Sequence, residues 1–280
     1  MKRFSAHRLA CAALTCAALF AGGCGMKADD GTEAREVLVF AAASLRDVME
    51  ALGRSYETAS GDEVFFNFAG TNVLARQIAA APGADLFLSA DETWMDFAAD
   101  AGRLAEGSRR DLLTNRLVVV TSDARAVRLS DPCALASMPF KYVAMGRPDG
   151  VPAGAYARAW MTAHDCGGAS LWQTLETRIA PAPDVRSALG LALAEPNVVA
   201  IVYHTDRLAF ADRLRVLYEV PPGEGPVIRY ALARIADAPH PEAARRFYAY
   251  LTGPEARAIF EHYGFVPIAG APSSPTSILP

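Results

Sequence analysis

The chain has 280 residues, of which 52% are hydrophobic and 21% are charged, and its formal net charge at pH 7 is −4. This length and composition suit a sizeable core or two lobes, and they exclude the collagen, coiled-coil and disordered classes. The acidic balance also argues against nucleic acid and anionic membrane surfaces as partners.

The first 23 residues have the pattern of a secretory signal peptide: three basic residues precede an apolar run at 9–20 and a small-residue cleavage site. The run is too short for a comfortable transmembrane helix, which needs about 20 apolar residues. Cys24 follows directly, and this arrangement resembles the bacterial lipoprotein signal, whose cysteine is lipidated and becomes the mature N-terminus. Because Ala21 stands where that motif prefers Leu, ordinary cleavage into the periplasm is the alternative. Both routes export the protein.

The stretches at the two ends of the exported chain are polar, or rich in proline and serine. Residues 24–35 are predicted to be a tether, and residues 269–280 a disordered tail. Loss of residues 1–23 removes three basic residues and no acidic one, which leaves 24 basic against 31 acidic side chains and a net charge of −7. A bound anion must therefore be captured by local geometry and not by the overall field.

The first pair of elements is a buried strand at 37–40 and a helix whose apolar positions share one face. Ser44 is predicted to cap the helix, with Asp47 three residues on completing a capping box. A strand that delivers small residues onto a helix N-terminus leaves free backbone N–H groups beside the positive end of the helix dipole. This junction therefore predicts an anion site.

Further strands and helices follow along the chain. Asp184 is predicted to cap one helix, Pro241 to begin another and Gly264 to end the last. The predicted strands lie at 63–68, 85–89, 117–121, 142–145, 198–203, 214–220 and 227–233, and the predicted helices at 73–81, 94–102, 156–162, 171–178, 185–195, 241–251 and 254–263.

Strands that alternate with helices at this spacing predict βαβ units and an α/β fold. We expect two lobes, each a mostly parallel sheet flanked by helices, with a ligand cleft between them. Lobe I is expected to comprise residues 36–115 and 236–268, and lobe II residues 116–235. The N-termini of helices from both lobes would face the cleft.

Sequence signatures of enzymes are missing from the exported chain, which has no G-x-G-x-x-G, Walker loop, H-E-x-x-H or G-x-S-x-G. Its histidines, at 164, 204, 240 and 262, share no metal-ligand spacing. A triad assembled from distant segments stays open, but no motif points to one, and we expect no catalytic residue and no cofactor.

Two cysteines, Cys133 and Cys166, remain after those of the signal and Cys24 are set aside. In an oxidising compartment a disulfide between them is the natural hypothesis. Two buried free thiols are the alternative, and the sequence leaves both open.

Several junctions where a strand or loop enters a helix carry small or hydroxyl residues. Each alone is ordinary capping, but their repetition in two blocks indicates a shared anion site built from uncharged donors. Tyr203 ends an apolar strand, where its hydroxyl could reach into a cleft; a core tyrosine is the alternative. The junctions are Ala43-Ser44, Thr71-Asn72, Pro152-Ala153-Gly154 and Asp184-Val185.

A series of segments in the order of the chain closely resembles the periplasmic molybdate-binding proteins of ABC transporters. The resemblance covers about 36–267 and implies a two-lobed type II periplasmic-binding-protein fold that closes on the anion. It also implies hand-over to a membrane permease driven by a cytoplasmic ATPase. The segments are AAASL (41–45), LARQI (74–78), ADLFLSAD (84–91), NRLVVV (115–120), GVPAGAYA (150–157), APAPDVRSAL (180–189), AIVY (200–203) and YGFVP (263–267).

Carried over by position, the resemblance implies that the oxyanion is held by hydroxyl and backbone N–H groups. These are the hydroxyl and N–H of Ser44, Thr71, the N–H groups of Ala153 and Val185, and the Tyr203 hydroxyl.

The chain departs from the family at Gly70-Thr71-Asn72, where relatives usually carry consecutive serines. Whether Thr71 or Asn72 supplies the main donor therefore stays open, and Ala43 is a further candidate contact. Arg186, beside Val185, is interpreted as a structural ion-pair former, because the family uses the neighbouring backbone.

The expected function is capture of molybdate and tungstate by a monomeric protein, periplasmic or anchored to the outer face of the membrane. A protein of the same fold for another oxyanion, such as sulfate or phosphate, is the nearest alternative. An exported α/β hydrolase is an alternative from another class.

Overall fold

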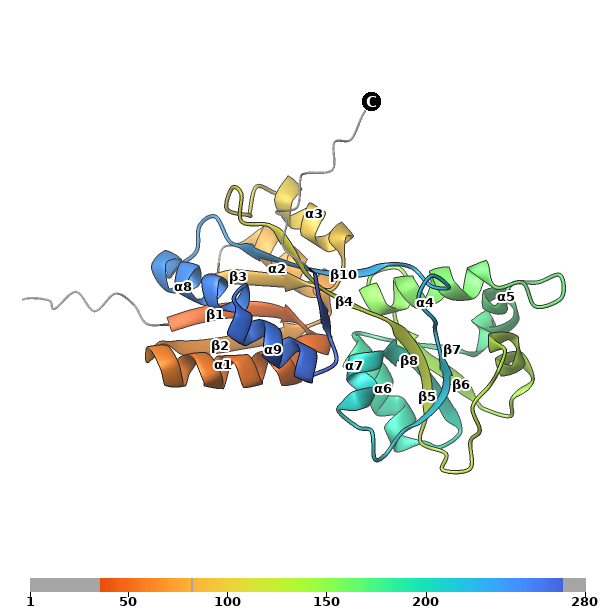
Figure 1. Cartoon of the computed structure of the whole chain (residues 1–280). Helices are drawn as coiled ribbons and strands as arrows, with labels where there is room; N and C mark the ends of the chain where they lie inside the picture. Colours follow the sequence, from red (N-terminus) through yellow and green to blue (C-terminus); the bar gives the residue numbers. More distant parts are fainter. Residues whose placement is uncertain (1–35, 82, 269–280) are drawn as a thin grey trace, which may run out of the picture. The chain divides into compact units, whose positions relative to one another are not determined.

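A computed structural model describes residues 36–81 and 83–268 (Figure 1). The predicted signal peptide at 1–23, the tether at 24–35 with the lipidation candidate Cys24, and the predicted tail at 269–280 lie outside these residues. The described residues belong to one compact unit and form two sheets.

The first sheet has the strand order β11-β4-β10-β3-β1-β2. Strand β1 pairs in parallel with β2 and β3, whereas β10 is antiparallel to β3 and β4, and β11 is antiparallel to β4. The strands are β1 (Glu36–Ala42), β2 (Glu63–Ala69), β3 (Leu86–Ser89), β4 (Arg110–Asn115), β10 (Ile228–Arg234) and β11 (Val266–Pro267).

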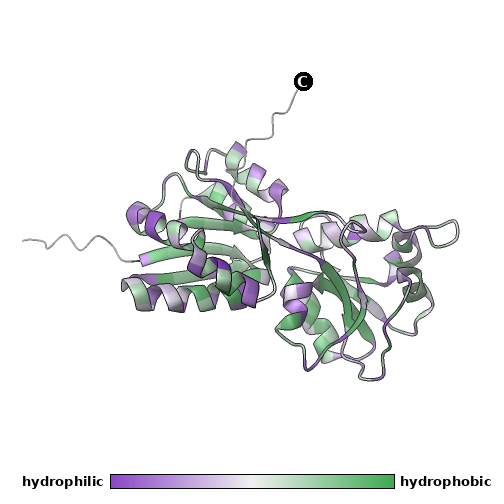
Figure 2. Cartoon of the chain, viewed as in Figure 1, coloured by the Kyte–Doolittle hydropathy of each residue, from purple (hydrophilic) through white to green (hydrophobic). Residues whose placement is uncertain are grey.

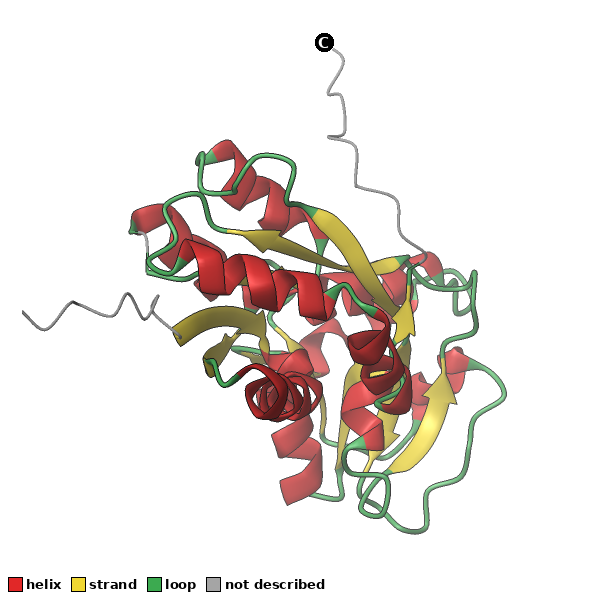
Figure 3. Cartoon of the chain, turned by 60° about the vertical axis from the view of Figure 1, so that its left-hand side comes forward, coloured by secondary structure: helices red, strands yellow, loops and turns green. Residues whose placement is uncertain are grey.

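Helices cover both faces of this sheet (Figure 3). Helices α1, α8 and α9 contact one another on one face, while α2 and α3 contact each other and bury a separate apolar cluster on the other. Their bounds are α1 (Arg46–Ser60), α2 (Thr71–Ala80), α3 (Glu92–Asp100), α8 (Pro241–Leu251) and α9 (Pro254–His262), and a short 3-10 helix, η1 (Ala43–Leu45), precedes α1.

The second sheet has the strand order β7-β6-β8-β5-β9. Strand β6 pairs in parallel with β7 and β8, and β5 is antiparallel to β8 and β9. The strands are β5 (Leu117–Thr121), β6 (Tyr142–Gly146), β7 (Ile179–Ala182), β8 (Val198–Tyr203) and β9 (Arg215–Glu219); the helices are α4 (Pro152–Ala163), α5 (Leu171–Leu175), α6 (Val185–Ala194) and α7 (His204–Leu208), with 3-10 helices η2 (Pro132–Ser137) and η3 (Glu176–Arg178).

The chain passes between the sheets twice. Only Arg116 separates β4 of the first sheet from β5 of the second, and residues 220–227 lead from β9 back to β10. The Arg116 guanidinium donates at 2.7 Å to Oε1 of Glu219, the last residue of β9, and so ties the first passage to the start of the second. The two sheets are therefore linked by short, adjacent segments.

The predicted α/β fold is confirmed, with two differences. The sheets are mixed, not mostly parallel, because strands next to the passages run against the strands at the centre of each sheet. The expected end of lobe II at residue 235 falls after β10, although β10 pairs with β3 and β4 of the first sheet. The boundary implied by the sheets therefore lies between β9 and β10. Apolar alternation marks β10 as a strand but cannot assign its partners.

Three strands, β4, β7 and β11, were not predicted. They are short or half-buried, so none shows the continuous apolar run that marks β5 and β8. Apolar residues are concentrated on the sheets, and polar residues on the outer faces of the helices (Figure 2).

Local signals at the helix ends are mostly confirmed. The Asp184 carboxylate accepts from Ser187 N–H at 2.8 Å, Pro241 begins α8, and Gly264, with φ of 85°, follows α9. The predicted capping box of Ser44 is wrong, because η1 moves the start of α1 to Arg46 and leaves Ser44 in a 3-10 turn with no side-chain cap.

The predicted disulfide is confirmed. Cys133, in η2, and Cys166, in the loop before α5, are joined by a disulfide with a Cα–Cα distance of 5.4 Å. The bridge ties η2 to the loop between α4 and α5.

Candidate functional site

A small cavity lies where the carboxyl ends of strands from both sheets meet. Six predicted positions line it: Ala43, Ser44, Thr71, Ala153, Val185 and Tyr203. The structure thus brings together residues that are spread over 160 positions of the sequence.

The first sheet supplies Ser44 and Thr71 through neighbouring parallel strands. Ser44 follows β1 within η1, and Thr71 is the first residue of α2 after β2. Ala42 of β1 pairs with Ala69 of β2, so the two strands end level with each other. Parallel strands place their carboxyl ends at one edge of a sheet, which is where ligands of open α/β sheets bind.

The second sheet supplies Ala153, Val185 and Tyr203 in the same way. They follow or end three strands that run in parallel, β6, β7 and β8. Helix α4 begins at Pro152 and not near Tyr156 as predicted, because a proline fits the first turn of a helix. Ala153 and Val185 therefore both lie in first turns, where backbone N–H groups have no partner within the helix.

A close backbone approach holds α4 at the cavity. A Cβ added at Gly154 would lie 1.9 Å from the carbonyl oxygen of Gly146, the last residue of β6. Only a glycine allows the first turn of α4 to lie against the strand end. The turn that presents the Ala153 N–H group is therefore set by this contact.

The hydroxyl groups of Ser44 and Thr71 are oriented by partners in the fold. Ser44 Oγ shares a hydrogen bond of 3.0 Å with the hydroxyl of Tyr230, and Thr71 Oγ1 accepts from Ala90 N–H at 3.2 Å. Since Thr71 Oγ1 accepts there, its own hydrogen is available to a ligand. Sequence reasoning missed Tyr230, which showed only the alternation of a strand.

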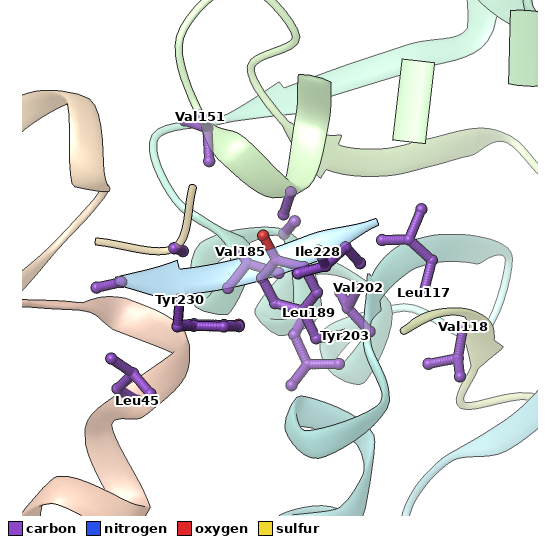
Figure 4. Close-up of a cluster of buried hydrophobic side chains, with 14 of the residues drawn as sticks. Leu45, Leu117, Val118, Val151, Val185, Leu189, Val202, Tyr203, Ile228 and Tyr230 are labelled. Carbon is purple, nitrogen blue, oxygen red and sulfur yellow. The ribbon is translucent and has the colours of Figure 1, made fainter. Parts of the chain in front are cut away.

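Tyr203 contributes a hydroxyl that the fold leaves unused. The residue is 1% exposed, and its hydroxyl has no hydrogen-bond partner among residues 36–81 and 83–268. Its ring packs edge-on against Tyr230 with centroids 5.8 Å apart, within a cluster that includes Val185 and Leu189 (Figure 4). Burial raises the pKa of this hydroxyl well above its ordinary value, so the group is a neutral donor.

The charged groups near the cavity are committed to other contacts. Asp184 lines it, but its carboxylate accepts from both the N–H and the hydroxyl of Ser187. Arg186 forms ion pairs with Asp47 and Asp206, as its interpretation as an ion-pair former predicted. The donors that face the cavity are therefore uncharged hydroxyl and N–H groups.

Asn72 lies beside the cavity and not in its wall. A Cβ at Gly70 would lie 2.8 Å from Asn72 Oδ1, and one at Gly150 would lie 3.2 Å from Asn72 Nδ2. The side chain therefore spans from α2 of the first sheet toward the segment before α4. Of the two candidates, Thr71 has the more direct access to the cavity.

A hydrogen bond between α3, on the side of the first sheet, and the segment before α4, on the side of the second, had no signal in the sequence. Trp94 Nε1, in α3, donates to the carbonyl oxygen of Gly150 at 2.8 Å. Periodicity assigns Trp94 to a helix face, and nothing in the sequence indicates a partner 56 residues away.

The described residues also bear on metal sites and membrane spans. Within 36–81 and 83–268, no three or more His, Cys, Asp or Glu residues are grouped so that they could hold a metal ion. In the same ranges, no helix combines the length and the apolar character needed to cross a membrane.

Two mixed sheets, joined by two short passages and meeting at a cavity of neutral donors, define the type II fold of periplasmic binding proteins. The chain belongs to the bacterial extracellular solute-binding protein family, whose model matches residues 37–266.

Two curated sequences and one solved structure are similar to this chain over most of its length. The molybdate-binding protein ModA of Escherichia coli (strain K12) is 35% identical over 242 residues, which cover 85% of this chain and 90% of the relative. The putative ABC transporter substrate-binding lipoprotein YvgL of Bacillus subtilis (strain 168) is 30% identical over 94% of this chain and 98% of the relative. The solved periplasmic molybdate-binding protein of Azotobacter vinelandii has a TM-score of 0.72 over 82% of this chain and 98% of its own, at 19% identity, which shows the fold alone.

Proposed function

We propose that this protein captures molybdate, and also tungstate, outside the cytoplasm and delivers it to an ABC permease. The observation that carries the proposal is the cavity lined by Ser44, Thr71, Ala153, Val185 and Tyr203, whose donors are all uncharged. The names of the relatives support the choice of molybdate among oxyanions. The export signal supports a location in the periplasm or, through Cys24, on the membrane surface.

Binding in this proposal consists of closure of the two sheets and their helices around the anion. A hydrogen bond to a charged group contributes about 1.5–3 kcal/mol, so five or more can retain a dianion that has lost its water. The positive ends of α2, α4 and α6 add to this, since each of these helices starts at the cavity. No bond is broken, and no residue is assigned a catalytic role.

Selection between oxyanions would follow from size and protonation. Molybdate and sulfate carry the same charge, so fixed donors that fit the larger ion would leave some donors unpaired around the smaller one. Phosphate carries a proton at neutral pH, and the proposed donor set offers that proton no acceptor.

Thermal unfolding and titration calorimetry with molybdate, tungstate, sulfate and phosphate test the proposal. A ligand at 100 times its Kd adds about 2.7 kcal/mol to the free energy of unfolding. We expect a large rise in Tm with molybdate and tungstate and none with sulfate. Stabilisation by sulfate or phosphate alone would assign the site to another oxyanion.

A further inference from the structure

One guanidinium contacts all three segments that carry the Ser44, Val185 and Tyr203 donors. Arg186 follows Val185 in α6, and its Nε donates to Asp206 Oδ1 at 2.6 Å. Its Nη2 donates to Asp47 Oδ2. Asp47 lies three residues after Ser44, and Asp206 lies three residues after Tyr203.

The two carboxylates differ in their place in the fold. Asp206 belongs to α7, which follows β8 of the second sheet, and its side chain is fully buried. Its Oδ2 also accepts from the Tyr203 N–H at 3.2 Å. The Arg186–Asp206 contact thus stays within the second sheet and its helices, where it fixes α6 against the end of β8.

Asp47, in contrast, belongs to the side of the first sheet. It is in α1, which covers the first sheet, and its side chain is 39% exposed. A second cavity flanks the contact, lined by Asp47 and Val48 from α1 and by Arg186, Thr205 and Leu208 from the second-sheet side. The Arg186–Asp47 ion pair joins the two sides directly here, beside a hydrogen bond of 2.9 Å from Asn115 Nδ2, at the end of β4, to Thr205 Oγ1 in α7.

We infer that Arg186 is a positioning residue whose ion pair with Asp47 latches the closed arrangement and slows release of the anion. The inference rests on the proposed function. The pair requires α1 and α6 to be as close as they are in this structure, so it stabilises this arrangement over one in which α1 and α6 have moved apart. A ligand enclosed by both sheets leaves only after opening, and its apparent affinity falls as the closed population falls.

Charge alone predicts the opposite effect, and this makes the latch testable. Asp47 carries a negative charge near a site for a dianion, so its removal would strengthen binding if simple repulsion governed the effect. The latch predicts that the same removal weakens binding. The sign of the change therefore separates the two explanations.

The test compares Asp47→Asn with Glu50→Gln by stopped-flow and calorimetry with molybdate. Glu50 is the matched control: it lies on the same helix, is 42% exposed, and pairs with Arg46 of that helix at 3.5 Å. We expect Asp47→Asn to release molybdate about tenfold faster. Glu50→Gln should match the wild type, and the Tm of both unliganded variants should change little, since both carboxylates are half-exposed and Arg186 keeps its ion pair with Asp206.

Partial rescue in Asp47→Glu, which restores the charge on a longer side chain, would further support the latch. An unchanged or slower release in Asp47→Asn, with normal binding by the wild type, overturns the latch alone. A wild-type protein that binds no oxyanion overturns the proposed function, and with it the role of the latch in release.

Discussion

Removal of one oxygen atom, in Tyr203→Phe, separates a binding role of this residue from a structural one. The hydroxyl is buried and has no partner within residues 36–81 and 83–268. Loss of a buried hydroxyl usually costs stability because its partner is left unpaired. Here no such partner exists in the described fold, so the free energy of unfolding of the unliganded protein should stay the same or rise slightly.

The effect on binding should be large. A hydroxyl that donates to a dianion contributes about 1.5–3 kcal/mol, which corresponds to about a 10- to 150-fold increase in Kd for molybdate. Titration calorimetry measures this change directly, and thermal unfolding without ligand measures the stability.

Tyr230→Phe is the control, because it removes the same atom from the neighbouring ring. Its hydroxyl bonds to Ser44 Oγ at 3.0 Å and to Asn115 Nδ2 at 3.4 Å. The unliganded protein should therefore lose about 0.5–1.5 kcal/mol in this variant. Equal molybdate affinity in Tyr203→Phe and the wild type would refute the assignment of Tyr203 to the site.

Three further predictions concern residues that hold the segments around the cavity in place. Gly154→Ala should lower the Tm and weaken molybdate binding, because the added Cβ would lie 1.9 Å from the carbonyl oxygen of Gly146. The control is Gly190→Ala, at an open position of α6, which should leave the affinity unchanged and the Tm unchanged or slightly higher. Burial raises the pKa of Asp91 to about 6, so this carboxyl holds its proton more tightly in the folded than in the unfolded protein, and its contribution to stability should be lost as pH rises from about 4 through 6. Asp91→Asn, which keeps an acceptor for the α3 cap, should flatten this slope by an amount of the order of 3 kcal/mol; an unaltered profile in denaturant titrations of the unliganded protein would contradict it. Trp94→Phe removes the 2.8 Å bond to the segment before α4 and should raise the Kd for molybdate several-fold, and an equal Kd would exclude a role in closure.

Much of the fold follows from signals that act over a few residues. The apolar runs of β5 and β8, the Asp184 cap, Pro241 at the start of α8 and Gly264 after α9 are all local, and each was predictable for that reason. The capping box of Ser44 is a local prediction that failed, because the 3-10 helix η1 precedes α1; the Ser44 hydroxyl bonds instead to Tyr230, 186 residues away.

The sequence alone determined the alternation of strands and helices and the residues at their junctions, since backbone propensity and capping depend on near neighbours. The tertiary structure decided which junctions meet. It assigned β10 to the first sheet, brought Ser44 and Tyr203 to one cavity, and joined Arg186 to Asp47 across 139 residues. Strand order and packing set such contacts, and neither is encoded in the periodicity of any single segment.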